Sequence, residues 1–354
     1  MGNDNSHPFT GPVCPVPLQR YPQILLAHGS GGKLTDQLIR ELIAPVFSNP
    51  ALDPLHDGAL VDAGGVRLAF STDSYVINPI FFPGGDIGRL AVFGTVNDLA
   101  MCAARPAWLS AGFIVEEGFP MEDLARVVRS MNEAALQAGV AIVTGDTKVV
   151  ERGKGDKIYI NTAGIGLVPG GRKVSPAAVR PGDAVLINGA IGLHGVAVMS
   201  FREGLRFSSQ VESDCAPLNT LVEDIYSVSP NVRMLRDPTR GGLASALNEI
   251  AREAKRGILL DEHAIPVTEE VRAACELLGL DPLYVANEGK CLVFVSPGDA
   301  DAVLSAMRKN PAGKGSAIIG TVTETHPGRV TMKTLVGGDR IVDMMSGEQL
   351  PRIC

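Results

Sequence analysis

The sequence lacks the patterns that mark several common classes of protein. Its six cysteines are scattered over 354 residues without a CxxC pair, which argues against a zinc site or a disulfide framework and favours a cytoplasmic protein. The net charge is −7 and no strongly basic run stands out, so we expect no nucleic-acid partner. The longest weakly polar stretch, AVLINGAIGLHGVAVM, is too short and interrupted to span a membrane.

The best-known nucleotide-binding and targeting motifs are also missing. There is no GxxxxGK[ST] and no GxGxxG, which excludes a P-loop and a Rossmann fingerprint. Residues 1–23 are polar and proline-rich, so we expect a flexible extension and not a secretory signal. The chain ends in Cys354, and a prenylation signal would need its cysteine four residues from the end. This thiol therefore needs another explanation.

The length and composition predict two domains with cores of their own, since 45% of the residues are hydrophobic. Residues 169–183 are rich in proline and glycine and predict the boundary between two α+β halves. Strands and helices alternate unevenly, which favours an α+β fold over a doubly wound parallel sheet. The expected division is an extension at 1–23, domains at 24–168 and 169–340, and a tail at 341–354.

Hydrophobic spacing predicts the individual elements. In the first half we expect helices at 34–47, 86–104 and 121–139, and strands at 66–77 with a break at 72–74, 107–117, 140–150 and 157–168. In the second half we expect helices from 195, around 221–228, and at 241–254, 267–279 and 299–310, strands at 184–188, 257–261, 291–296 and 316–322, and a hairpin at 329–342.

Aspartates stand where strands or helices meet turns. The five are Asp57, Asp73, Asp98, Asp146 and Asp237. Each alone is typical of a turn or a helix cap. Most of them lie among small residues, however, and carboxylates are the groups through which Mg²⁺ bridges a protein to nucleotide phosphates. Asp98 and Asn97 lie together within a predicted helix, an awkward place for short polar side chains unless they face a ligand.

Two glycine-rich turns precede predicted helices. AHGSGGKL contains Gly31 and Gly32, and RDPTRGGLA contains Arg240 before a glycine pair. Backbone N–H groups at a helix start attract phosphate, and an arginine offers a fork of donors to phosphate oxygens. Each turn alone is weak support, because glycine also serves ordinary loop geometry. Together with the aspartates, the turns favour a nucleotide site that is not a P-loop.

Lys148 and Glu288 are candidates for chemistry. Lys148 lies two positions after Asp146, so both side chains point to one face of an extended strand. A salt bridge and a catalytic role explain this spacing equally well. Glu288 lies in VANEGKCLV, a glycine turn that enters an apolar strand. It is either an exposed turn residue or a partly desolvated base with a raised pKa, and the sequence leaves both open.

The stretches STDSYVI, FGTVNDLAM, TGDTKVV, RDPTRGGLA and NEGK, with the ending PRIC, resemble the HypE family of carbamoyl dehydratases. This family belongs to the PurM-like (AIR-synthetase-like) superfamily, and the resemblance covers nearly all of the chain from AHGSGGKL onward. It implies a two-domain α+β fold, a homodimer in which strands of the N-terminal domains pair, and a mobile C-terminal tail. The first 23 residues lie outside it.

The resemblance implies ligands for ATP and Mg²⁺ between the domains. The metal ligands would be Asp57, Asp73, Asp98 and Asp146. The residues that bind ATP or its phosphates would be Gly31, Gly32, Asn97, Thr147, Asp237 and Arg240. Asp57 and Asp237 are the less secure members of the two sets.

The resemblance also implies a reaction on the chain's own last residue. Cys354 would accept a carbamoyl group from the carbamoyltransferase HypF, and phosphorylation of the amide oxygen by ATP would make that oxygen a leaving group. Lys148 would stabilise negative charge and Glu288 would take a proton, which gives a thiocyanate. The cyano group would pass to iron on the HypC–HypD complex during [NiFe]-hydrogenase assembly, with Ser346 and Gly347 as a hinge for the tail.

Two other interpretations account for part of the sequence. Selenophosphate synthetase and thiamine-monophosphate kinase are ATP-using members of the same superfamily, but the former is expected to carry cysteine or selenocysteine beside lysine in its early glycine-rich loop. AHGSGGKL contains no cysteine or selenocysteine. The ending PRIC is explained by neither of the two enzymes. A non-catalytic thiol carrier with a purely structural nucleotide site is the second alternative. The number of candidate Mg²⁺ ligands argues against it.

Overall fold

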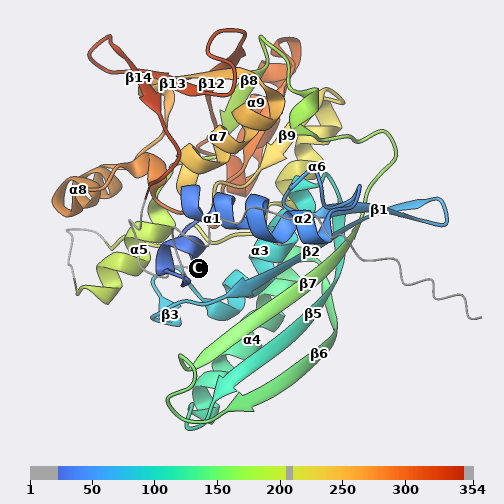
Figure 1. The fold of residues 1–354 in the computed structure, drawn as a ribbon, viewed down its shortest axis with the longest axis vertical. Coiled ribbons are helices and arrows are strands. Elements are labelled where there is room, and N and C mark those ends of the chain that lie inside the picture. The colour runs from blue at the N-terminus through green and yellow to red at the C-terminus, as the bar shows by residue number, and fades with distance from the viewer. Residues whose placement is uncertain (1–22, 205–209, 347–354) are drawn as a thin grey trace, which may run out of the picture.

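The computed structural model describes residues 23–204 and 210–346. Its elements form two large sheets, one before and one after segment 169–183 in the chain, and a small two-stranded sheet (Figure 1). Helices pack on each large sheet, and the predicted α+β class is confirmed. The predicted extension at 1–23 falls almost wholly outside the described residues, as do the last eight residues of the tail. None of the helices in the described ranges has the length and apolar character needed to cross a membrane.

The first sheet has five strands in the order β1-β2-β7-β5-β6, and only β5 and β6 are parallel. The strands are β1 (Ala59–Ala63), β2 (Val66–Tyr75), β5 (Arg105–Glu116), β6 (Ala141–Val150) and β7 (Ile158–Leu167). Helices α3 (Ile87–Met101) and α4 (Met121–Ala138) cover one face, and the small pair β3 (Phe81–Phe82) and β4 (Gly85–Asp86) precedes α3. The opposite face carries exposed apolar side chains, among them Phe70, Trp108, Ile114 and Ile165.

Two predictions for this half are wrong in detail. The expected break at 72–74 does not occur, because Thr72, Asp73 and Ser74 all pair with β7 in a long antiparallel ladder that outweighs their local turn preference. The expected helix at 34–47 is divided into α1 (Lys33–Leu38), a π turn (Ile39–Ile43) and α2 (Ala44–Phe47). Pro45 has no N–H for the carbonyl of Glu41, and the helix widens just before it.

The second sheet has seven strands in the order β14-β13-β10-β12-β8-β11-β9. The strands are β8 (Ala184–Ile187), β9 (Val232–Arg236), β10 (Gly257–Asp261), β11 (Leu292–Val295), β12 (Ala317–Thr323), β13 (Val330–Lys333) and β14 (Asp339–Val342). The helices are α5 (Leu193–Arg202), α6 (Asn219–Val228), α7 (Gly242–Ala254), α8 (Glu269–Leu278) and α9 (Ala300–Lys309). The hairpin expected at 329–342 is confirmed as β13–β14, whereas β9 was not predicted.

Helix α3 belongs to both domains. Nearly every one of its residues is buried, so it is apolar all round, as a helix in a core should be. Its first turns pack in the core of the five-stranded sheet, while Ala100 and Met101 join the core around α6 and β9. Figure 1 shows α1 and α2 lying across the junction between the two sheets. The end of α3 is therefore fixed by contacts from both domains.

An ion cluster on the outside of this junction ties the domains further. Glu223 on α6 accepts hydrogen bonds from Arg105 on β5 and from Arg172 in the connecting segment. The Arg172 guanidinium also stacks 4.3 Å from the centre of the Tyr226 ring. The hydrogen bond from Arg172, followed by the one from Arg105, lowers the pKa of Glu223 to about 2.

This cluster predicts acid sensitivity. Because the pKa of Glu223 is lowered on folding, its stabilisation is present above its ordinary value of about 4.5 and is lost as the pH falls toward about 2. We expect Glu223→Gln to lower the free energy of unfolding by about 1 kcal/mol at pH 7, a modest amount because the cluster is partly exposed. Urea unfolding of both proteins between pH 7 and pH 3 measures this difference, which should shrink with acid. Glu324→Gln, which removes an exposed loop carboxyl, is the control; a difference independent of pH contradicts the prediction.

Candidate active site

Five carboxyl groups from both domains meet where the sheets adjoin. Asp73 comes from β2 and Asp98 from α3; Asp57 precedes β1, Asp237 follows β9, and Glu288 precedes β11. They lie close enough for their charges to act on one another: Asp237, Asp57 and Asp73 all act on Asp98, and Asp237 and Asp73 act on Glu288. Four of the five predicted aspartates and the predicted base are thus brought together.

Burial and mutual repulsion raise the pKa of these acids. Burial is the largest cause for Asp98, followed by repulsion from the other aspartates, and its pKa lies well above the usual range. Burial raises the pKa of Asp237 to about 6, although the nearby Arg236 opposes the change. The side chain of Glu288 is only 4% exposed, and burial followed by the charge of Asp214 raises its pKa well above the ordinary value. The cluster therefore favours an incoming positive charge.

Two arginines, Arg236 and Arg240, partly neutralise this negative charge. Arg236 Nε lies 2.9 Å from Asp57 Oδ1, and the same guanidinium pairs with Glu249 on α7. Burial raises the pKa of Asp73 and Glu288, and the charge of Arg240 partly offsets this rise in both. Asp57 Oδ2 is buried without a hydrogen-bond partner. A lone oxygen of this kind, beside further carboxylates, has the chemistry of a ligand for a hard cation.

The two glycine-rich turns pack against each other. A Cβ on Gly31, whose φ is +74°, would lie 2.6 Å from the carbonyl oxygen of Arg240, and one on Gly241 would lie 2.7 Å from the carbonyl oxygen of Gly31. Arg240 Nη1 in turn donates to the carbonyl oxygen of Gly29 at 2.6 Å. Only glycine allows the backbones to approach so closely. The predicted phosphate-binding residues Gly31 and Arg240 thus belong to one structure beside the acids.

The start of the tail is held at the same place. The N–H of Lys33 donates to the carbonyl oxygen of Met345 at 3.0 Å, and Lys33 Nζ pairs with Asp343 at 2.6 Å. A Cβ on Gly32 would meet the Met345 carbonyl oxygen at 2.6 Å. The chain therefore leaves the described fold at Ser346, directly beside the glycine turn. Cys354 and Gly347, which was predicted to be part of a hinge, lie outside the described residues.

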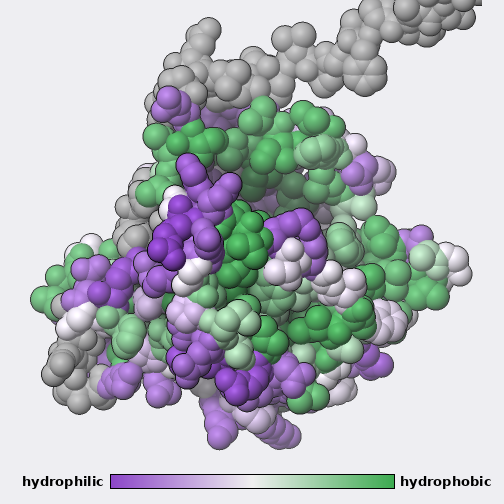
Figure 2. Space-filling view, turned by 90° about the horizontal axis from the view of Figure 1, so that it is seen from below, coloured by the Kyte–Doolittle hydropathy of each residue, from purple (hydrophilic) through white to green (hydrophobic). Residues whose placement is uncertain are grey.

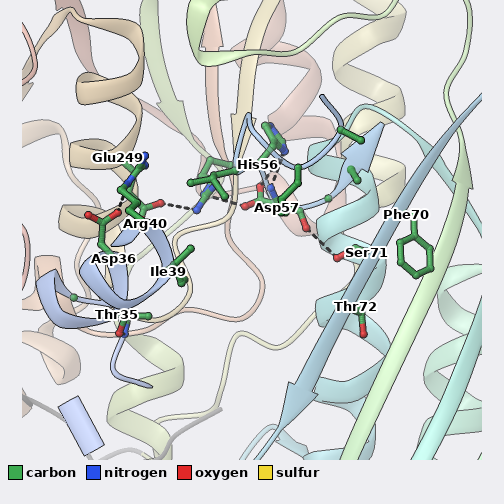
Figure 3. A pocket seen from close by; sticks show the side chains of 18 residues that line it. Thr35, Asp36, Ile39, Arg40, His56, Asp57, Phe70, Ser71, Thr72 and Glu249 are labelled. Carbon is green, nitrogen blue, oxygen red and sulfur yellow. Dashed lines mark hydrogen bonds and ion pairs between the residues drawn. The ribbon is translucent and has the colours of Figure 1, made fainter. Parts of the chain in front are cut away.

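A cavity of about 450 Å³ adjoins the cluster. Figure 3 shows Thr35, Asp36, Ile39 and Arg40 on its helical side, Ser71 and Thr72 on β2 opposite them, and Asp57 between. Ser71 Oγ donates to Asp98 Oδ2 at 2.7 Å, which connects the cavity wall to the acids. Half of the lining residues are polar or charged, so the cavity suits a polar ligand better than an apolar one.

Asp146, Thr147 and Lys148 are not brought to the cluster. They lie on the edge strand β6, where Asp146 and Lys148 form an exposed ion pair of 2.5 Å. The strand register aligns Asp146 with Gly112, Asn161 and Ser74 in one row across the sheet. Three strand spacings of about 4.8 Å place Asp146 roughly 14 Å from β2. The predicted common face of Asp146 and Lys148 is found, but it is the open face of the sheet.

The side chain of Asn97 makes hydrogen bonds to the backbone of the second domain. Its Nδ2 donates to the carbonyl oxygens of Ala216 and Glu288, and its Oδ1 accepts from the N–H of Leu218. The side chain is 2% exposed, and its amide is engaged by backbone on both sides. In the described chain Asn97 thus joins α3 to the second domain; a direct contact with ATP stays a prediction.

Sequence reasoning missed Arg236, Asp214 and Lys290. Arg236 directly precedes Asp237, but an arginine within an apolar strand gave no sign that its partner was Asp57. Lys290 and Asp214 form a buried ion pair at 2.9 Å beside Glu288. Lys290 stands in the stretch NEGK, which could have indicated it, whereas Asp214 lies in an irregular segment without a recognisable pattern.

The donor set fits Mg²⁺ bound together with a phosphate ligand better than a preformed metal centre. Within the described residues, no three His, Cys, Asp or Glu side chains are arranged to hold a metal ion by themselves. Mg²⁺ commonly uses one or two carboxylates, and takes its other ligands from water and substrate phosphates. Burial, followed by repulsion from neighbouring acids that Arg236 only partly offsets at Asp57, raises the pKa of Asp57 and Asp98, and a bound cation would oppose this rise.

The fold and this acid cluster define an AIR synthase related protein. Residues 55–168 match the family model of its N-terminal domain and residues 180–333 that of its C-terminal domain. The chain is 54% identical to carbamoyl dehydratase HypE of Cupriavidus necator over 94% of this chain and 95% of that protein, and 48% identical to that of Escherichia coli over 94% and 99%. The chain belongs to the HypE family of carbamoyl dehydratases.

Solved structures of HypE proteins are also similar to this chain. A crystal structure of the HypE–HypF complex matches with a TM-score of 0.83 and 49% identity over 87% of this chain and 99% of that chain. HypE in complex with ATP matches with a TM-score of 0.80 and 50% identity over 94% and 100%. A ThiL protein complexed with AMPPCP and TMP has a TM-score of 0.68 over 88% and 96% but only 18% identity, so it shares the fold alone.

The contact between the glycine turns predicts a specific effect of Gly31→Ala. Gly139, whose φ is +69°, has nothing within 4 Å of an added Cβ, so Gly139→Ala is a matched control for backbone strain. We expect Gly31→Ala to lower the free energy of unfolding by about 1–3 kcal/mol more than the control, because it adds a steric clash. Urea unfolding and amide hydrogen exchange in α1 measure the effect. Equal losses in the two variants, with unchanged exchange in α1, contradict the prediction.

Proposed function

We propose that this protein is an ATP-dependent carbamoyl dehydratase that acts on its own Cys354 during [NiFe]-hydrogenase maturation. The observation that carries the proposal is the attachment of the tail at Gly32 and Lys33, beside the cluster that contains Glu288. Eight residues follow Ser346, and an extended chain of that length spans about 28 Å. The terminal thiol can thus reach the site. The names of the curated relatives and the HypE structure with ATP support the same conclusion.

The reaction begins with an S-carboxamide on Cys354, which loses water poorly because its oxygen is a bad leaving group. Transfer of the γ-phosphoryl group of ATP to that oxygen makes it leave as phosphate, and loss of both nitrogen protons gives the thiocyanate. Glu288 is the base in this proposal: it is buried, and its raised pKa makes its ionised form a strong proton acceptor. Arg240 favours that ionised form.

ATP and Mg²⁺ are the proposed cofactors. Gly32 would offer a backbone N–H and Arg240 a guanidinium to phosphates, and Gly31, whose N–H donates to Thr35 Oγ1, would hold the two turns together. Asp73 and Asp98 would offer carboxylates to the ion, with Asp57 and Asp237 nearby. When bound, Mg²⁺ offsets the negative charge of the transferring phosphate. The cavity between α1 and β2 provides space next to these groups.

We place Lys148, Asp146 and Thr147 in the site through a homodimer. Within one chain they lie on the far side of the sheet from the acids, so they can act on a carboxamide only in a neighbouring subunit's site or on a tail that crosses to them. The open sheet face carries apolar residues that a monomer would leave in water, including Phe70, which is 45% exposed. Hydrophobic patches are visible from below the molecule (Figure 2). A second copy on this face would bury them and deliver Lys148.

The partners follow from the same reaction. HypF would supply the carbamoyl group, and the relative solved as a HypE–HypF complex supports this. The HypC–HypD complex would receive the cyano group, because a thiocyanate needs an acceptor metal to become a ligand. A cytoplasmic location accords with four described cysteines that form no disulfide, Cys102, Cys215, Cys275 and Cys291.

Intact-mass analysis tests the reaction. After incubation with HypF, carbamoyl phosphate and ATP, we expect a carbamoyl adduct that loses one water only when ATP and Mg²⁺ are present. Cys354→Ala should form no adduct, whereas Cys275→Ala, which removes a buried thiol, should behave as the wild type does. An adduct that persists with ATP and Mg²⁺ contradicts the dehydratase and leaves the thiol-carrier interpretation.

Mixing two inactive variants tests the dimer. Glu288→Gln and Lys148→Ala should each accept carbamoyl but slow dehydration by about 10²–10⁴-fold, because each removes one catalytic group. The two variants are mixed in equal amounts, dissociated and allowed to form dimers again. If Glu288 and Lys148 of one site come from different subunits, about half of the dimers contain one subunit of each variant, and one of the two sites in such a dimer is intact. The mixture then dehydrates at about a quarter of the wild-type rate. The amount of water loss in the mixture is measured by mass.

The control is a mixture of either variant with itself, taken through the same dissociation. No recovery in the mixed sample, despite confirmed subunit exchange, contradicts the assignment of Lys148 to a neighbouring subunit. Normal dehydration by Glu288→Gln removes Glu288 from the mechanism.

A further inference from the structure

The segment that carries Glu288 is irregular and held in place by side chains from other elements. Residues 285–291 form neither helix nor strand. Asn287 Nδ2 donates to the carbonyl oxygen of Pro238 at 2.8 Å, and Asn188 Nδ2 donates to that of Gly289 at 3.0 Å. Because the segment has few hydrogen bonds of its own, these side-chain contacts determine where the Glu288 carboxyl points.

Both the N–H and the carbonyl oxygen of Glu288 form hydrogen bonds with side chains. Its N–H donates to Asp214 Oδ1 at 3.1 Å, and its carbonyl oxygen accepts from Asn97 Nδ2 at 3.3 Å. Asn97 belongs to the first domain, and Asp214 to the segment that leads into α6. The two contacts fix the peptide groups on both sides of the side chain that is proposed to take the proton.

Asp214 is a buried carboxylate with a dedicated counter-ion. Its Oδ2 lies 2.9 Å from Lys290 Nζ, and the side chains are 3% and 9% exposed. Burial raises the pKa of Asp214, but Lys290, His194 and the hydrogen bond from Glu288 outweigh this effect, and the pKa lies below its usual value. An ionised acceptor makes a stronger hydrogen bond than a neutral one, so the Glu288 N–H is firmly held.

The backbone of this segment is also fixed by close packing. A Cβ on Gly289 would lie 1.9 Å from the carbonyl oxygen of Asp214, and one on Gly84 would lie 2.6 Å from the N–H nitrogen of Ser213. The hydroxyl of Ser213 accepts from the N–H of Cys215 at 3.1 Å. The chain around Asp214 is thus wedged between two glycines, and a shift of Asp214 would move Glu288.

We propose that Asp214, with Lys290 as its counter-ion, is the residue that positions Glu288 for proton removal. This inference rests on the proposed dehydratase function and adds two positioning residues to it. Neither contacts the reacting atoms in this assignment: Asp214 acts through the backbone of Glu288, and Lys290 acts through Asp214. An ion pair at this place also keeps the buried Asp214 charge compensated, since an unpaired buried charge would be costly.

Two neutral replacements of the pair separate positioning from stability. In Asp214→Asn/Lys290→Gln, the amide oxygen at 214 can still accept from the Glu288 N–H. In Asp214→Leu/Lys290→Met, that acceptor is lost, and neither variant leaves a buried charge unpaired. Asp214→Ser/Lys290→Gln is a second variant without the acceptor, because a serine hydroxyl is too short to reach; it serves if the Leu–Met variant does not fold by circular dichroism.

The readouts are carbamoylation and single-turnover water loss, both measured by intact mass with HypF, carbamoyl phosphate, ATP and Mg²⁺. We expect the variant with the acceptor to dehydrate within about fivefold of the wild type, since its hydrogen bond is weakened but kept. The variants without the acceptor should dehydrate about 10²-fold more slowly, because a small displacement of a catalytic group has an effect of that order. Carbamoylation should be the same in all.

Equal slowing with and without the acceptor overturns the proposal, as does a parallel loss of carbamoylation. A second comparison uses the Glu288→Gln background, in which loss of the acceptor should cost less than about threefold, because a positioning residue has no effect once its partner is removed. A full additional 10²-fold loss in that background also overturns it. Failure of the wild type to lose water would instead contradict the dehydratase function itself, so the two failures are distinguishable.

Discussion

Mutual repulsion among buried carboxyl groups is the constraint on which this structure depends. Asp57, Asp98 and Asp237 stand near one another in a poorly hydrated space, and a protein gains nothing in stability from such an arrangement. The fold tolerates it because Arg236 and Arg240 stand among the acids and because the surrounding elements cannot move apart. A site of this kind is poised for a cation with phosphate, which would remove the repulsion on binding.

Helix α3 is what prevents the acids from separating. It is buried on all sides and enters the cores of both domains, so Asp98 on this helix faces the acid groups of the second domain at a fixed place. Asn97, one residue earlier, ties the same turn to the backbone of Glu288. Asn97 thus stabilises the domain junction, and Asp98 contributes a carboxyl group to the acid cluster.

Local chemistry was readable from the sequence where it depends on one element. The glycine turns before two helices and the common face of Asp146 and Lys148 were predicted correctly, whereas contacts of Asn97 and Asp98 with a ligand stay predictions. One failure is local, because Pro45 interrupts the helix expected at 34–47, whereas the others concern long-range pairing. The ladder between β2 and β7 overrides the turn preference of residues 72–74, and nothing local tells which sheet face Lys148 occupies. The positioning role proposed for Asp214 could not be predicted, because it depends on contacts with Glu288 and Lys290, about 75 residues away in the sequence.

The hydrogen bond between Met345 and the glycine turn has a consequence for the kinetics of the reaction, because it keeps the start of the tail beside the site. A reactant joined covalently to its own site meets that site at an effective concentration that does not depend on the amount of protein in solution. The conversion of the carbamoylated cysteine is therefore expected to be first order. Loading by a partner, and release to the next one, then become the steps at which the supply of the product is controlled.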